Sequence, residues 1–130
     1  MHSNKNLKQI HKPPTVPSYF LSGIRHLQIH HTRLRNKCSN LNSDLYNNHL
    51  RDNAACACGC LQEDAEHYFF HCPLYRDQRI QLFHSTRTYH PISLNKLLFG
   101  IETETNIANT HIFNAVQRYI KNTKRFDQPT

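Results

Sequence analysis

The feature that most constrains this chain is a cluster of cysteine and histidine residues in one short stretch. Four of its five cysteines lie between residues 56 and 72, together with two histidines. Clustered thiols and imidazoles, with an odd total of cysteines, favour a metal site over a disulfide framework. A structural zinc site takes four such ligands in a tetrahedron. The sequence therefore predicts that this segment folds around a zinc ion.

Spacing narrows the choice of ligands without settling it. The pattern Cys-x-Cys, eight residues, His, four residues, Cys favours Cys56, Cys58, His67 and Cys72. Cys60 and His71 are alternates. Gly59 allows the backbone to turn sharply after the first pair. The Cys-x-Cys pair is tighter than the Cys-x2-Cys of most zinc modules, so a competing interpretation stays open: reduced, partly buried thiols without a metal.

The apolar residues outside this cluster recur at spacings of three and four, which predicts helices rather than strands. Helices are expected at residues 19–37, 42–51, 63–70, 73–84, 93–99 and 105–123, with a loop at 52–62. The predicted fold is all-α. It is a single helical zinc-binding domain over residues 18–126, with the zinc motif 56–72 in a loop, a disordered basic tail at 1–17 and a short tail at 127–130.

The helical period also predicts which side chains face the core. His31 and Cys38 fall on the apolar stripe that begins at residue 20, so we expect a packed core histidine and a buried thiol. In the helix at 73–84 the side chains expected to point inward are Leu74, Ile80, Leu82 and Phe83.

Charge is unevenly distributed along the chain. The total is 16 Lys and Arg against 9 Asp and Glu, yet residues 1–51 carry +7 and residues 52–72 carry −4. A basic half suits an anionic partner, of which nucleic acid is the commonest, whereas a solvated basic surface is the simpler interpretation. The candidate nucleic-acid-binding residues flank the loop: Arg33, Arg35, Lys37, Arg76, Arg79, Lys124 and Arg125.

Other classes of protein are disfavoured. Apolar runs reach only three or four residues, and the polar N-terminus lacks the apolar centre of a secretory signal, so we expect an intracellular, nuclear or cytoplasmic chain without a membrane partner. No nucleophile elbow is present, and no small-molecule substrate is expected. A metal nuclease would need an open coordination position and a base such as Glu66. Three thiolate ligands favour a closed structural site instead, so no catalysis is expected.

The cluster and its flanks resemble the C-terminal zinc-binding tail of non-LTR (LINE-type) retrotransposon reverse transcriptases. The resemblance is carried by the Cys-Ala-Cys-Gly run at 56–59 and by residues 63–75, with Glu66-His67 and Cys72-Pro73, followed by Arg79. Residues 31–42 and 116–126 resemble the flanking segments of that family, so the likeness covers about residues 19–126. It implies the ligands Cys56, Cys58, His67 and Cys72, and a tail that holds RNA or DNA beside a polymerase.

The chain departs from that family in lacking the enzyme itself. A reverse transcriptase needs aspartates for two metal ions, and this sequence has no Asp-Asp pair. The resemblance therefore covers the tail alone, as expected of a fragment, a decayed copy or a stand-alone gene. The predicted function is a zinc-stabilised nucleic-acid-binding module. The alternative is a structural zinc-held helical domain for protein interaction.

Overall fold

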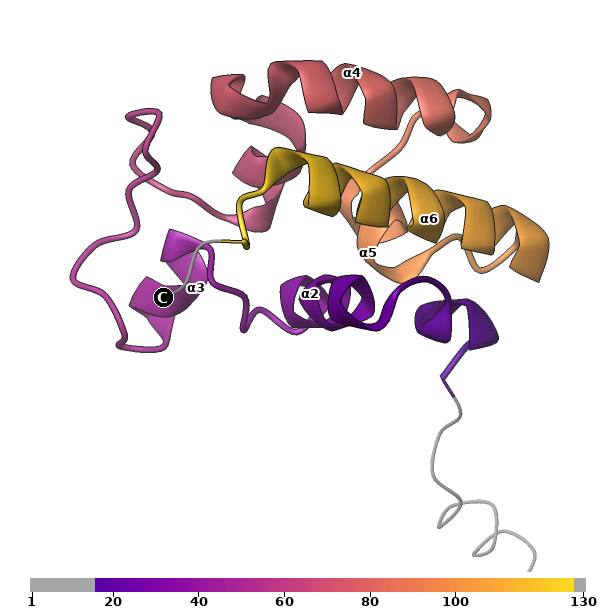
Figure 1. The fold of residues 1–130 in the computed structure, drawn as a ribbon, viewed down its shortest axis with the longest axis horizontal. Helices are drawn as coiled ribbons and strands as arrows, with labels where there is room; N and C mark the ends of the chain where they lie inside the picture. The colour runs from indigo at the N-terminus through magenta and orange to yellow at the C-terminus, as the bar shows by residue number, and fades with distance from the viewer. Residues whose placement is uncertain (1–15, 128–130) are drawn as a thin grey trace, which may run out of the picture.

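A computed structural model describes residues 16–127, and all the regular elements within this range are helical (Figure 1). The longer helices are α2 (Arg25–Arg35), α4 (Arg76–Ser85) and α6 (Asn106–Thr123). The shorter elements are η1 (Ser18–Leu21), α3 (Asn42–Asn47), η2 (His67–His71), η3 (Pro73–Tyr75), η4 (Arg87–Tyr89) and α5 (Leu94–Phe99). The prediction of an all-α fold is confirmed. Most of the predicted tail 1–17, and residues 128–130, lie outside the described residues.

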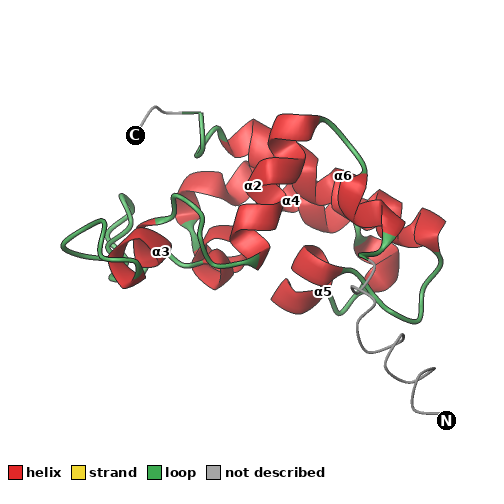
Figure 2. Cartoon of the chain, turned by 90° about the horizontal axis from the view of Figure 1, so that it is seen from below, coloured by secondary structure: helices red, strands yellow, loops and turns green. Residues whose placement is uncertain are grey.

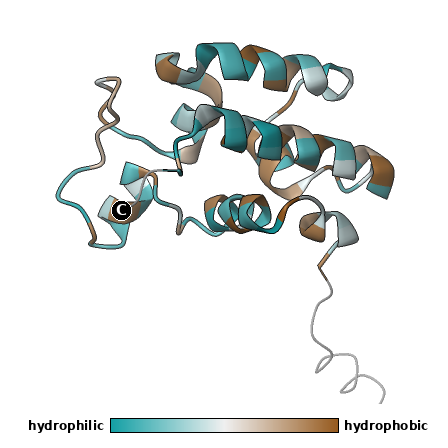
Figure 3. Ribbon diagram, in the orientation of Figure 1, coloured by the Kyte–Doolittle hydropathy of each residue, from teal (hydrophilic) through white to brown (hydrophobic). Residues whose placement is uncertain are grey.

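Helix α6 is the centre of the structure, with α2 on one side and α4 on the other (Figure 1). It begins after Thr105, whose Oγ1 accepts a hydrogen bond from the backbone N–H of Ala108 at 3.0 Å. Both hydrophilic and hydrophobic residues occur along it (Figure 3). Its buried side chains include Ile112, Phe113, Val116, Tyr119 and Ile120. Burial of this apolar face is the main source of stability for the helices around it.

Phe113 joins three elements at the core. Its ring lies 5.0 Å from that of Tyr19, 5.4 Å from Phe20 and 4.3 Å from His31, measured between centroids. His31 is 1% exposed and pairs through Nε2 with the carbonyl of Leu97 at 2.9 Å. The prediction of a packed core histidine is confirmed. Burial lowers the pKa of His31 to about 4, so the ring is neutral at pH 7 and donates its Nε2 proton to that carbonyl.

The first predicted helix, 19–37, is wrong in two places. Gly23 has a φ of +91°, and a Cβ there would lie 1.9 Å from Gln117 Oε1. The helix is therefore interrupted between η1 and α2, at the point where the backbone packs against α6. Helix α2 then ends at Arg35, and Lys37 adopts a left-handed φ of +58°. Because of this turn, the residues after Lys37 no longer continue the apolar face of α2. Cys38 is consequently exposed, and the prediction of a buried thiol is wrong.

The other differences concern which side chains face the core and where one helix ends. Leu74 is 53% exposed and Ile80 is 57% exposed, so the prediction that both point inward is wrong. Leu74 lies in the 3-10 turn η3, whose three residues per turn put it out of line with α4. Leu82 and Phe83 do pack against the core. The second predicted helix, 42–51, stops at Asn47.

The predicted loop lies at one end of the molecule, beside α3 and away from α5 (Figures 1 and 2). It runs from the end of α3 to the turn before η2, and its middle lacks regular structure. No helix within residues 16–127 has the length and apolar character needed to cross a membrane.

Candidate metal centre

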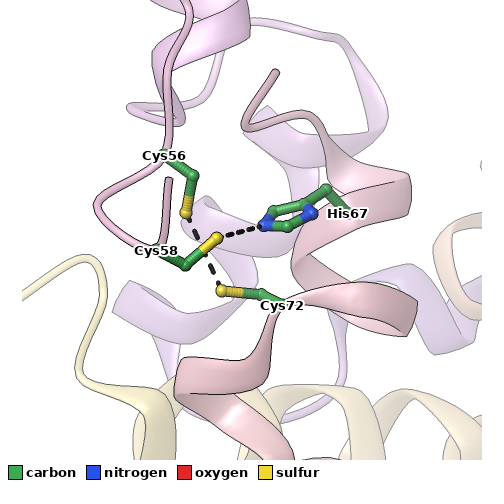
Figure 4. Close-up of side chains that lie close together, drawn as sticks. All are labelled: Cys56, Cys58, His67 and Cys72. Carbon is green, nitrogen blue, oxygen red and sulfur yellow. Dashed lines mark hydrogen bonds between the residues drawn. The ribbon is translucent and has the colours of Figure 1, made fainter. Parts of the chain in front are cut away.

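Cys56, Cys58, His67 and Cys72 converge at this end of the molecule (Figure 4). One donor atom from each lies within 4.8 Å of the other three. The sulfur atoms of Cys56 and Cys72 are 3.7 Å apart, and Sγ of Cys58 is 3.3 Å from Nε2 of His67. The structure thus brings together the four ligands that the sequence favours, and this cluster could hold a metal ion.

The two alternates lie outside this cluster. Cys60 is exposed, and its Sγ is 3.5 Å from the carbonyl oxygen of Gln62. The exposed His71 has its Nε2 3.3 Å from the carboxylate of Glu66. Glu66, the candidate base of a metal nuclease, is therefore paired with the alternate histidine.

A tight turn of the loop presents the first two cysteines. The backbone N–H of Gly59 bonds to the carbonyl of Cys56 at 3.0 Å, and the N–H of Cys56 bonds to the carbonyl of Cys60 at 2.8 Å. Gly59 has a φ of +100°, which side-chain-bearing residues rarely adopt. The N–H of Cys60 also points at Sγ of Cys58 at 3.5 Å. The turn holds both sulfurs on one side of the loop and supplies one of them with a backbone donor.

A π-helical turn presents the other two ligands. In an α-helix, residues five apart point about 140° away from each other, so His67 and Cys72 could not share a face. In η2 the N–H of Cys72 instead bonds to the carbonyl of His67 at 2.8 Å, a wider five-residue turn. The carboxylate of Asp64 accepts the N–H of His67 at 2.8 Å and fixes where this turn begins. The wider turn brings both donors to the loop.

Two of the donor–donor distances are compatible with tetrahedral coordination. Two thiolates bonded to one ion at about 2.3 Å, at tetrahedral angles, lie about 3.8 Å apart, and a thiolate and an imidazole nitrogen lie about 3.6 Å apart. The 3.7 Å and 3.3 Å separations are close to these values. The sulfurs of Cys56 and Cys72 are also far beyond the length of a disulfide bond, about 2.05 Å. The geometry therefore suits a shared ion rather than a covalent bridge.

The electrostatics of the cluster call for a cation if its thiols ionise. Burial raises the pKa of Cys56 to about 12 and also raises the pKa of Cys72. The backbone N–H of Cys60 lowers the pKa of Cys58 by stabilising its thiolate. Three thiolates this close repel one another, so the metal-free cluster retains protons on its two buried sulfurs. A bound cation would displace those protons and remove the repulsion.

Glu63 and Arg125 form an ion pair beside the cluster. Arg125 donates from Nε and Nη2 to the two carboxylate oxygens of Glu63, both at 2.7 Å, and from Nη2 to the carbonyl of Asn40 at 3.0 Å. Glu63 is 2% exposed, also accepts the N–H of Asn42, and lies 3.9 Å from Sγ of Cys56. These contacts raise the pKa of Arg125, chiefly through the Glu63 hydrogen bonds. The pair ties the loop to the chain just after α6.

Sequence reasoning missed this role of Glu63 and placed Arg125 among the nucleic-acid-binding residues. Two of the other candidates are also engaged within the molecule. Arg35 donates to the carbonyl of Leu98 and lies 4.0 Å from the centre of the Phe20 ring. Arg79 donates to the carbonyls of Phe69 and Cys72. The remaining candidates are exposed: Arg33, Lys37, Arg76 and Lys124.

Fold and site together define a small helical domain with a Cys3His cluster that could hold a metal ion. No protein family, no curated protein and no solved structure matches the chain.

Proposed function

We propose that this chain is a zinc-stabilised nucleic-acid-binding module, similar to the tail of a retrotransposon reverse transcriptase. The observation that carries the proposal is the convergence of four donor atoms within 4.8 Å of one another. Three thiolates and one imidazole in a tetrahedral arrangement are a usual ligand set for structural zinc. Because all four positions come from the chain, none is left for water or substrate, which supports a structural rather than a catalytic role.

Zinc would supply stability where the chain has little apolar surface to bury. Around the cluster, Cys58 is partly exposed, Cys60 is exposed and Leu61 is 84% exposed. In small metal-binding domains the free energy of metal binding adds directly to the free energy of folding. A bound ion would therefore fix the loop, and through Glu63 it would fix the end of α6.

The exposed cations support the nucleic-acid part of the proposal. Arg33 lies in the last turn of α2 and Lys37 lies two residues after its end. Arg76 begins α4, and Lys124 follows α6. Contacts from such groups to phosphates give binding that is largely independent of sequence and weakens steeply with salt.

Fluorescence anisotropy with a labelled single-stranded RNA and a labelled DNA duplex, each over a series of salt concentrations, tests this part. Replacing both Arg33 and Lys37 by alanine should weaken binding and reduce the slope of log affinity against log salt by about 1.5. The matched control is Lys96→Ala, because Lys96 already donates to the carbonyl of Pro91. Binding of the wild type that does not change with salt would overturn the nucleic-acid proposal.

The second candidate function is a structural zinc-held domain that binds protein. It is favoured by one observation: Arg35, Arg79 and Arg125 are each bonded within the molecule. A chain that holds zinc but binds neither RNA nor DNA at low salt would overturn the first candidate and leave this one.

A further inference from the structure

A groove on the outer side of η1 and α2 takes no part in the metal centre. It has a volume of about 260 Å³. Phe20, Leu21 and Ile29 supply its apolar lining, and Arg25 and Arg33 supply two guanidinium groups. Helices η1 and α2, which line the groove, form one edge of the molecule in Figure 1.

Helix α2 has two distinct faces that explain the groove. Its inward face, Leu27, His31 and Leu34, is buried in the core. Arg25, Ile29 and Arg33 recur at intervals of four residues, so they follow one another along a different face. That second face lines the groove with η1 and is not covered by any other described part of the chain.

Exposed apolar side chains are concentrated in this part of the chain. Leu21 is 67% exposed, Ile24 is 57% exposed and Ile29 is 37% exposed. Val16, just before η1, is 60% exposed. Phe20, Leu21 and Ile29 line one groove. Apolar side chains grouped on a surface mark a site of interaction, whereas single ones scattered over a surface do not.

The two charged side chains that line the groove, Arg25 and Arg33, are both cationic. Residues 16–43 contain four Arg and Lys side chains and no Asp or Glu. Within the described residues, neither Arg25 nor Arg33 takes part in an ion pair. A ligand that fills the groove must therefore combine apolar side chains with negative charge.

We propose that this groove docks an acidic amphipathic helix of a partner protein. Leucine-like side chains of that helix would fill the space between Leu21 and Ile29, and its carboxylates would pair with Arg25 and Arg33. A nucleic acid would use the two arginines but gain nothing from the apolar lining. A second copy docked through the same face would bring four guanidinium groups together. The proposal does not depend on zinc, but it shares Arg33 with the nucleic-acid proposal, so the two ligands would compete for this side chain.

The probe is a labelled helical peptide of about five turns, with leucine at positions i, i+3, i+4 and i+7 and glutamate at most others. Two peptides serve as comparisons: one with the same composition in scrambled order and one with lysine in place of glutamate. Fluorescence anisotropy with the full chain should show that the leucine–glutamate peptide binds at least about tenfold tighter than either comparison. Equal binding of the three peptides would overturn the proposal.

Variants locate the binding on the molecule. Replacing both Leu21 and Ile29 by serine should weaken peptide binding at least about tenfold. These side chains are already exposed, so the circular dichroism spectrum should not change. The matched control replaces Leu61 and Ile107, each 84% exposed, by serine and should bind the peptide like wild type.

Variants also distinguish a partner helix from the two other candidate occupants, nucleic acid and a second copy of the chain. The Leu21 and Ile29 double variant should bind RNA and DNA like wild type and should sediment like wild type. Loss of nucleic-acid binding in an Arg25→Ala variant, with peptide binding unchanged, would assign the groove to nucleic acid. Loss of self-association in the double variant would assign it to a second copy. Either result would overturn the proposal.

Discussion

The helical bundle and the loop that carries the Cys3His cluster hold their shapes by different means. In the bundle, α6 buries a continuous apolar face against α2, α4 and α5, with Phe113 at its centre. The loop has no such face. It depends on the cluster of Cys56, Cys58, His67 and Cys72, on backbone hydrogen bonds within its own turns, and on the ion pair between Glu63 and Arg125.

The difference shows how a chain of this size can order a segment without a core of its own. Polar and sulfur contacts are directional, so each must be placed accurately, whereas apolar packing tolerates substitution if volume is kept. Truncating the apolar side chains of the bundle should therefore act through lost volume, and mutations in the loop through lost geometry or charge. The predictions below test that distinction, beginning with the largest effect.

Phe113→Ala should lower the free energy of unfolding by about 4 kcal/mol, because it leaves a cavity among Tyr19, Phe20 and His31. Urea denaturation followed by circular dichroism measures this loss. Ile107→Ala, on the same helix but 84% exposed, is the control and should change stability by less than about 0.5 kcal/mol. Equal effects of the two substitutions would show that the bundle is not held by this core.

Arg125→Met should cost about 3 kcal/mol, because it leaves the buried carboxylate of Glu63 without its cation. Adding Glu63→Gln to the same chain should recover part of the loss, since the remaining amide carries no charge. Lys124→Met, which removes an exposed neighbouring cation, should have little effect. If all three variants unfold at the same urea concentration as wild type, the ion pair does not join the loop to the bundle.

Acid should destabilise the bundle through His31. Its pKa is about 4 in the folded chain against about 6.5 in an unfolded one, so the unfolded state binds more protons between these values. Stability is therefore unaffected above about pH 7 and falls by about 3 kcal/mol as the pH drops to 4. Protonation would place a second N–H at Nδ1, which is buried without a hydrogen-bond partner among the described residues.

Urea denaturation at a series of pH values measures this effect of His31. His31→Gln keeps a donor for the carbonyl of Leu97 but cannot become an imidazolium, so its stability should depend less steeply on pH. His84→Gln, at an exposed position, should retain the slope of wild type. A slope for His31→Gln equal to that of wild type would contradict the assignment.

Gly59→Ala should have the smallest effect, about 1 kcal/mol, because only backbone strain opposes it. No atom lies within 4 Å of the added Cβ, but φ is +100°. Gly100→Ala in the bundle should cost more, since its Cβ would lie 2.7 Å from the Tyr19 ring. Thermal unfolding of the two variants compares their stabilities directly. A larger loss of stability for Gly59→Ala than for Gly100→Ala would contradict the view that the bundle is the more tightly packed region.

Local signals in the sequence predicted the features that depend on neighbouring residues. The ends of α5 and α6 follow from Ser93 and Thr105, whose side chains accept the N–H three residues on, and from Gly100 after α5. The Cys and His spacing predicted which ligands would converge. These features were accessible because the residues that fix them lie close together in the sequence: three residues apart for the two caps, and within residues 56–72 for the cluster.

The features that the sequence did not predict depend on distant contacts. Glu63 and Arg125 are 62 residues apart in the sequence, and nothing local to either residue indicates the other. The break at Gly23 depends on Gln117 of α6 in the same way. The π-helical turn of η2 is a different case, because α-helical periodicity offers no sign of it although it lies within one segment.

The most direct test of the central claim is the metal content of the purified chain, measured by native mass spectrometry and by elemental analysis. We predict one zinc ion per chain for wild type, loss of the ion in Cys58→Ser and Cys72→Ser, and retention of the ion in Cys60→Ser and Cys38→Ser. A wild-type chain that is folded and carries no zinc, or a Cys60→Ser chain that loses the ion, would contradict the account.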